Sequence, residues 1–161
     1  MYATSIALEV NPVTDDTAVT EIEAQVALLL RLADRNRRST TRLVTTLERS
    51  AYLALRLLET TGPSGINEIA DHLRLDASTV TRQVLAMEAA GYVTRERDAH
   101  DGRRAVVTTT PAGRAALAET RAARAEVYAD VLADWSAQDR GLLAELLTRL
   151  NGDLDAHATR T

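Results

Sequence analysis

Apolar positions along the chain recur at the spacing of amphipathic helices. Residues 19–33 and 47–58 carry apolar side chains every three or four positions, and the segment TGPSG ends the second pattern. The leucine-rich segment 142–154 carries an apolar stripe that is too wide for a lone surface helix to leave exposed. The chain is therefore predicted to be mainly helical, with long terminal helices that need a partner surface.

The centre of the chain combines two short helical patterns with two β-prone runs. The first helix covers INEIADHLRL, with Asn67 as its N-cap, and Asp76 caps the second helix. The runs 92–94 and 105–109 flank the turn-rich segment DAHDGR, which is typical of a β-hairpin. Two helices joined by a tight turn and followed by a hairpin form a winged helix-turn-helix.

The expected fold class is mainly α (α+β): a winged helix-turn-helix with long N- and C-terminal helices that form a dimerisation region. Thr110 followed by Pro111 predicts the start of the first C-terminal helix. We expect a flexible arm at 1–16, a dimerisation helix at 17–46, a DNA-binding domain at 47–110 and dimerisation helices at 111–157.

Composition excludes several functions. The chain has 161 residues, 45% of them hydrophobic, which is enough for one compact domain. The absence of cysteine excludes disulfides, thiolate metal sites and cysteine nucleophiles. The three histidines are too scattered to predict a metal site, and no cofactor is expected.

The longest clearly apolar run indicates a protein that does not enter the membrane. Residues 26–33 include Arg31 and fall far short of the roughly 20 residues that a span needs. The first residues lack the basic region of an export signal, so we expect a cytoplasmic protein. The formal net charge of -4 shows that any nucleic-acid surface must depend on the placement of a few arginines.

The start of the second short helix carries hydrogen-bonding side chains that ordinarily weaken a helix. In a winged helix-turn-helix this helix enters the major groove, where short polar groups approach phosphates and base edges closely. One good base contact, at about 1–3 kcal/mol, outweighs the helix penalty of a hydroxyl. The candidate DNA-binding residues of this helix are Ser78, Thr79, Thr81, Arg82 and Gln83.

The segment LDASTVTRQVLAMEAAGYVTRERDAHDGRRAVVTTTPAGR resembles the recognition helix and wing of the MarR family of transcription factors. The wing signature of that family, D-x-R-x-x-x-x-x-L-T-x-x-G, reads here as Asp101, Arg103, Thr110 and Gly113, with Thr109 at the usual leucine. The upstream LERSAYLALRLL also resembles the second helix of the family. The resemblance covers roughly residues 20 to 155.

The resemblance implies that Arg103 enters the minor groove and that Asp101 orients it through a carboxylate–guanidinium pair. In the alternative interpretation, these two residues only hold the hairpin turn together. Arg95, Arg97 and Arg104 lie on or near the same hairpin, and each is either a phosphate contact or a solvated edge residue.

A homodimer is expected because one winged helix reads few base pairs and two half-sites lie about 34 Å apart. An intramolecular bundle built from the same apolar residues is the alternative. MarR-family relatives are often repressors released by small aromatic anions, so the resemblance also implies a possible aromatic or phenolic effector, whose pocket no local motif defines. The candidate dimerisation residues are Val19, Ile22, Val26, Leu132, Trp135, Leu143, Leu147 and Leu150.

The predicted function is a sequence-specific regulator that binds a pseudo-palindromic double-stranded operator, with repression as the expected sign. An enzyme is disfavoured because the sequence has no glycine-rich phosphate loop, nucleophile elbow or paired-histidine motif. A winged helix that contacts a protein instead of DNA remains as the alternative. Salt dependence of binding discriminates these two functions.

Overall fold

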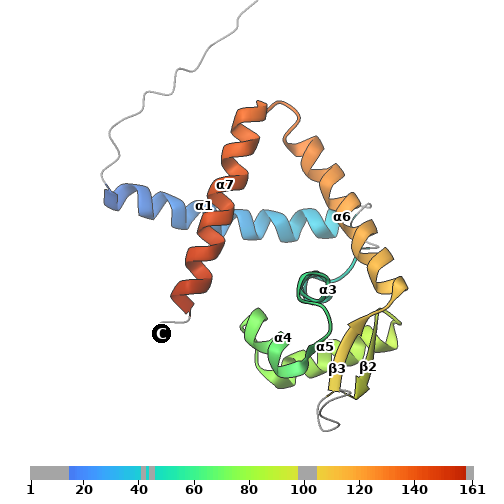
Figure 1. Ribbon diagram of the computed structural model, residues 1–161. Helices are drawn as coiled ribbons and strands as arrows, with labels where there is room; N and C mark the ends of the chain where they lie inside the picture. The colour runs from blue at the N-terminus through green and yellow to red at the C-terminus, as the bar shows by residue number, and fades with distance from the viewer. Residues whose placement is uncertain (1–14, 41–42, 44–45, 98–104, 159–161) are drawn as a thin grey trace, which may run out of the picture. The chain divides into compact units, whose positions relative to one another are not determined.

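The computed structural model describes residues 15–40, 43, 46–97 and 105–158. The chain divides into two compact units, Met1–Thr45 and Thr46–Thr161. The first unit contains α1 (Asp15–Ser39), drawn in blue in Figure 1. This helix begins within the arm expected at 1–16 and ends before residue 46. The apolar spacing marks the helix's apolar stripe and not its start, because a first turn needs no apolar residue.

The second unit contains a winged helix-turn-helix followed by two long helices, which confirms the expected fold class (Figure 1). Its elements, in chain order, are α3 (Arg49–Thr61), β1 (Ser64–Gly65), α4 (Ile66–Leu73), α5 (Ala77–Ala89), β2 (Val93–Arg97), β3 (Ala105–Thr109), α6 (Pro111–Val131) and α7 (Ala137–Ala158).

Short polar side chains cap α5 and α6 as the sequence predicts. Asp76 accepts a hydrogen bond from the backbone N–H of Thr79, and Thr110 accepts one from the N–H of Gly113. The prediction of Asn67 as the N-cap of α4 is wrong, because Gly65 occupies that position. The N–H of Gly65 donates to Glu68 Oε2 at 2.8 Å, so the carboxylate three residues into the helix stabilises its start.

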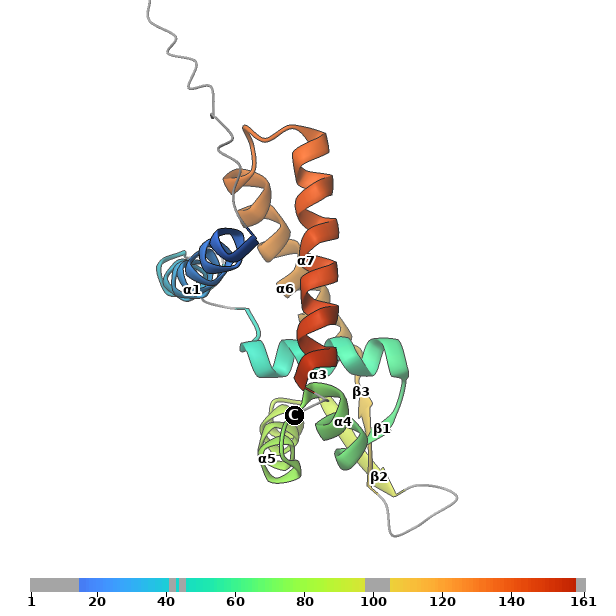
Figure 2. The same ribbon diagram turned by 90° about the vertical axis from the view of Figure 1, so that its left-hand side faces the viewer.

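The sheet has three strands in the order β1-β3-β2, all antiparallel. β2 and β3 form the predicted hairpin, with Val93 opposite Thr109 and Arg97 opposite Ala105. β1 was not predicted, because two residues are too few for an alternating pattern to show. It pairs Ser64 with Val107 and so joins the helix-turn-helix to the wing. Figure 2 shows β1 beside the hairpin.

The core of the second unit lies where α3, α4, α5 and the sheet meet. Large side chains at this point are almost completely buried, and they come from both helices of the helix-turn-helix, from β2 and β3 and from α6. This burial holds α5 by one face and leaves its other face to solvent. The largest buried residues are Leu55, Ile69, Leu117, Val80, Val84, Val93, Val107 and Thr120.

Gly113 lies where the first turn of α6 packs against the residue that precedes β2. A Cβ at this position would lie 2.1 Å from the backbone oxygen of Tyr92 and 3.0 Å from Thr109 Cγ2. The same Tyr92 oxygen accepts the N–H of Thr110 at 3.0 Å, so the backbone there is held in place. The glycine of the wing signature is therefore required by a close backbone approach.

Thr109 carries a buried hydroxyl with no hydrogen-bond partner in the described part of the chain. Replacing Thr109 with valine keeps the shape and removes the unsatisfied group, so we expect the free energy of unfolding to rise by about 1 kcal/mol. Urea denaturation measures this change. Thr94→Val, at an exposed position of β2, controls for the higher β-propensity of valine. A stability gain no larger than that of the control would contradict the prediction.

No helix among the described residues is long and apolar enough to cross a membrane.

Candidate nucleic-acid interface

The N-terminus of α5 carries a compact hydrogen-bond network around the carboxylate of Asp76. Oδ1 accepts the backbone N–H of Thr79 at 2.8 Å and also the hydroxyl of Ser78. Oδ2 accepts the hydroxyl of Thr79 at 2.6 Å. These hydrogen bonds, chiefly those from the two hydroxyls, hold the pKa of Asp76 well below its usual value. The start of α5 is therefore ordered by an ionised carboxylate.

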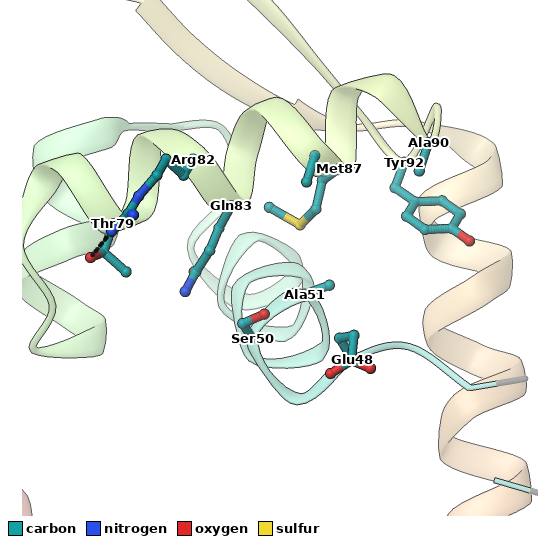
Figure 3. Close-up of a pocket in the computed structure, with 10 residues that line it drawn as sticks. Glu48, Ser50, Ala51, Thr79, Arg82, Gln83, Met87, Ala90 and Tyr92 are labelled. Atoms are coloured by element: carbon teal, nitrogen blue, oxygen red, sulfur yellow. Dashed lines mark hydrogen bonds between the residues drawn. The ribbon is translucent and has the colours of Figure 1, made fainter. Parts of the chain in front are cut away.

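Arg82 lies one turn further along α5 and is exposed. Its Nη2 donates to Thr79 Oγ1 at 3.2 Å, the contact drawn as a dashed line in Figure 3. Thr81 is half-buried, and its hydroxyl donates to the backbone oxygen of Ala77 at 2.7 Å. Arg82 thus joins the network of Asp76, whereas the hydroxyl of Thr81 bonds to its own helix.

Gln83 points toward α3 and not along the surface of α5 (Figure 3). Its side chain lines a groove of about 470 Å³ with Ser50 and Ala51 of α3 and Met87 of α5. Its Oε1 is buried and makes no hydrogen bond within the described residues. The helical period explains this placement. Gln83 comes three positions after Val80 and four positions before Met87, so it lies on the same face of α5 as these two buried residues.

In the described part of the wing, one of the predicted arginines forms an ion pair within the domain. Arg95 Nε donates to Glu88 Oε2 at 2.8 Å, and Nη2 lies 2.7 Å from the same oxygen. This ion pair braces β2 against the C-terminal part of α5. Arg97 is exposed at the end of β2. Asp101, Arg103 and Arg104 lie outside the described residues.

Several of the candidate dimerisation residues expose much of their apolar side chains to solvent. Val19 and Ile22 of α1 are more than half exposed, and Trp135, between α6 and α7, is 45% exposed. Leu147 is exposed, and Leu143 and Leu150 are half-buried on α7, as are Leu132 and Val26 on their own segments. α7 has no buried residue, so the described residues of its own unit leave its leucine stripe uncovered.

Sequence reasoning missed two residues that shape this surface. Asp76 was predicted only as a helix cap, although its carboxylate also accepts hydrogen bonds from the hydroxyls of Ser78 and Thr79. Glu88 was not predicted at all, and its partner Arg95 lies seven residues later on another element. The pair follows from the packing of β2 on α5, which no local spacing signals. No group of three or more histidine, aspartate or glutamate side chains in the described segments could hold a metal ion.

Known proteins resemble this chain in sequence and in structure. The sequence model of the MarR family matches residues 47–105. An uncharacterised HTH-type transcriptional regulator of Bacillus subtilis strain 168, YxaD, is 41% identical over 105 residues, which make up 65% of this chain and 73% of that protein.

Two solved structures show the same fold. A MarR family protein from Bacillus stearothermophilus superposes with a TM-score of 0.72 at 24% identity, over 88% of this chain and 98% of that one. BpsR of Bordetella bronchiseptica, whose DNA binding is regulated by 6-hydroxynicotinic acid, superposes with a TM-score of 0.60 at 22% identity, over 79% of this chain and 98% of that one.

The protein has a helix-turn-helix packed against a β-hairpin, and polar side chains lie along the free face of the second helix. This arrangement places it in the class of winged helix-turn-helix proteins. The identity with YxaD extends over most of that protein, and the family model covers the helix-turn-helix and the first strand of the wing. The chain belongs to the MarR family of transcriptional regulators, which are DNA-binding proteins and not enzymes.

Proposed function

We propose that this protein is a homodimeric, sequence-specific transcriptional regulator that represses genes by binding a pseudo-palindromic operator in the cytoplasm. One observation carries the proposal. The hydroxyls of Ser78 and Thr79 and the guanidinium of Arg82 form one connected group at the free end of α5. That end of a recognition helix is the part that meets base edges in the major groove.

The wing adds contacts beside α5. Arg97 is exposed on β2, and we propose that it contacts phosphate, while Arg103 reaches the minor groove with Asp101 restraining it. Arg95 is a weaker candidate than the sequence suggested, because its guanidinium already pairs with Glu88. We propose that Arg95 acts mainly by fixing the angle between β2 and α5.

The uncovered apolar surface of the long helices supports the proposed dimerisation. Leu142, Leu146 and Leu154 of α7 are each more than half exposed, which is unusual for leucines on one helix of a monomer. A second copy would cover them and would place two recognition helices on successive turns of DNA. Beside these leucines, the interface would contain the residues predicted from the sequence: Val19, Ile22, Val26, Leu132, Trp135, Leu143, Leu147 and Leu150.

A small aromatic or phenolic effector is proposed to release the operator. The support is the regulation of BpsR, a protein of the same fold, by 6-hydroxynicotinic acid. Such a compound must bind the DNA-free arrangement of the dimer more tightly than the DNA-bound one, because only differential affinity shifts an equilibrium.

Selection of bound duplexes from a random pool tests the proposal. We expect enrichment of one inverted repeat whose half-sites are about 34 Å apart, and a footprint covering both. For the selected duplex, log K should fall linearly with log salt, with a slope of about -0.9 for each phosphate contacted. Failure to enrich any sequence, together with a flat salt dependence, would favour a winged helix that binds a protein partner.

A further inference from the structure

The hydroxyl protons at the start of α5 are already used inside the protein. Ser78 and Thr79 both donate to the carboxylate of Asp76, with 2.6 Å between Thr79 Oγ1 and Asp76 Oδ2. The hydroxyl of Thr81 donates to the backbone oxygen of Ala77. A hydroxyl has one proton and two lone pairs, so each of these groups retains only its capacity to accept.

This polarity limits what the hydroxyls can contact on DNA. Phosphate oxygens only accept hydrogen bonds, so an acceptor-only hydroxyl gains nothing from them. In the major groove, guanine N7 and O6 and thymine O4 are also acceptors. The donors available there are the exocyclic amino groups, N4 of cytosine and N6 of adenine.

We infer that Ser78 and Thr79 read exocyclic amino groups of cytosine or adenine in the major groove, and that Asp76 is a positioning residue that sets this preference by holding their protons. The inference rests on the proposed function, because it names the base chemistry read by the same helix. It concerns base specificity, a role beyond the capping of α5 by Asp76.

Two properties of the network favour its survival on DNA. Hydrogen bonds to a carboxylate are about twice as strong as those between neutral groups, so turning a hydroxyl toward a neutral base costs more than it returns. The lowered pKa of Asp76 keeps this carboxylate ionised, and therefore an acceptor, at the neutral pH of a binding assay.

Arg82 supplies the opposite polarity on the same face. It donates once to Thr79 Oγ1, and a guanidinium has five N–H groups, so most of its donors remain for the bases. Guanine, with two acceptors in the major groove, is the base that arginine reads best. Because Arg82 lies three positions after Thr79 on the helix, the two side chains address neighbouring positions. A guanine should therefore lie close to the amino-bearing base in each selected half-site.

The first experiment removes amino groups from DNA one at a time. In the duplex selected by the wild-type protein, each adenine of a half-site is replaced by purine, and each cytosine by 2-pyrimidinone, both of which lack only the exocyclic amine. At one position or more we expect binding to weaken about fivefold, the value of one hydrogen bond. In a Thr79→Val or a Ser78→Ala variant, the same base change should have no further effect.

The second experiment reverses the polarity of one hydroxyl. Asp76→Asn retains a side chain that caps helices as well as aspartate does, but its amide donates where a carboxylate oxygen accepted. The hydroxyl facing that amide is then free to donate outward. Selection with this variant should therefore replace the amino-bearing base by guanine or thymine. Thermal melting by circular dichroism checks that α5 remains folded.

Asp71→Asn is the matched control, because it removes the same charge from an exposed position of α4. We expect it to alter affinity equally for all sequences and to leave the selected sequence unchanged. If the wild-type protein selects a duplex but tolerates every amino deletion, or if Asp76→Asn selects the same bases as Asp71→Asn, the inference is wrong and the proposed function stands. If the wild-type protein selects no duplex, the proposed function itself fails.

Discussion

Replacing Gly113 with alanine is expected to lower the free energy of unfolding by about 3 kcal/mol. The new Cβ would lie 2.1 Å from the backbone oxygen of Tyr92, a distance at which the backbone must move. That oxygen also accepts the N–H of Thr110, which caps α6, so the displacement would weaken the junction between the wing and α6. Chemical denaturation with a helicity signal measures the loss.

Gly152→Ala is the control for this substitution. Gly152 is also helical, but apart from its chain neighbours and the backbone of its own helix turn nothing lies within 4 Å of its Cβ position, and the helical period places it opposite the leucines of α7. Alanine favours a helix over glycine by about 1 kcal/mol, so this variant should be more stable than the wild type. Equal effects of the two substitutions would show that the contact with Tyr92 does not determine the choice of glycine at residue 113.

Replacing Arg82 with alanine is expected to weaken binding to the selected operator by about 10- to 100-fold, the value of a bidentate contact to guanine. Binding to unrelated duplexes should change far less, because Arg82 would contribute a base contact and not only charge. Fluorescence anisotropy with the selected duplex and a scrambled one, at one fixed salt concentration, measures both effects.

Arg149→Ala removes the same charge from α7, where Arg149 pairs with Asp153 on the exposed surface. It should leave the ratio of specific to nonspecific affinity unchanged. If Arg82→Ala weakens binding to all duplexes alike, Arg82 is a phosphate contact and another side chain of α5 reads the guanine. Its effect on the salt slope would then be close to one phosphate contact.

Local patterns predicted most of the elements for identifiable reasons. Asp76 and Thr110 each cap a helix within three residues of themselves, and the hairpin follows from two β-prone runs around a turn. The prediction of Asn67 as an N-cap was wrong although asparagine is a residue type that favours this position. The pairing of β1 with β3, which no local pattern signals, places the N-cap at Gly65 and the first helical residue at Ile66. The sequence predicted which residues belong to the candidate site, but not which way their side chains point.

By itself, the sequence determined the order of helices and strands, the helix that carries the candidate DNA-binding residues and the family, because helical period, caps and wing signature are all local in the chain. Tertiary structure alone decided which of those residues face outward. Packing of α5 on α3 turns Gln83 inward, packing of β2 on α5 commits Arg95 to Glu88, and the close approach of Tyr92 excludes any side chain at Gly113. Each of these three contacts depends on the distance between segments that are far apart in the sequence. The local pattern of residues does not encode such distances.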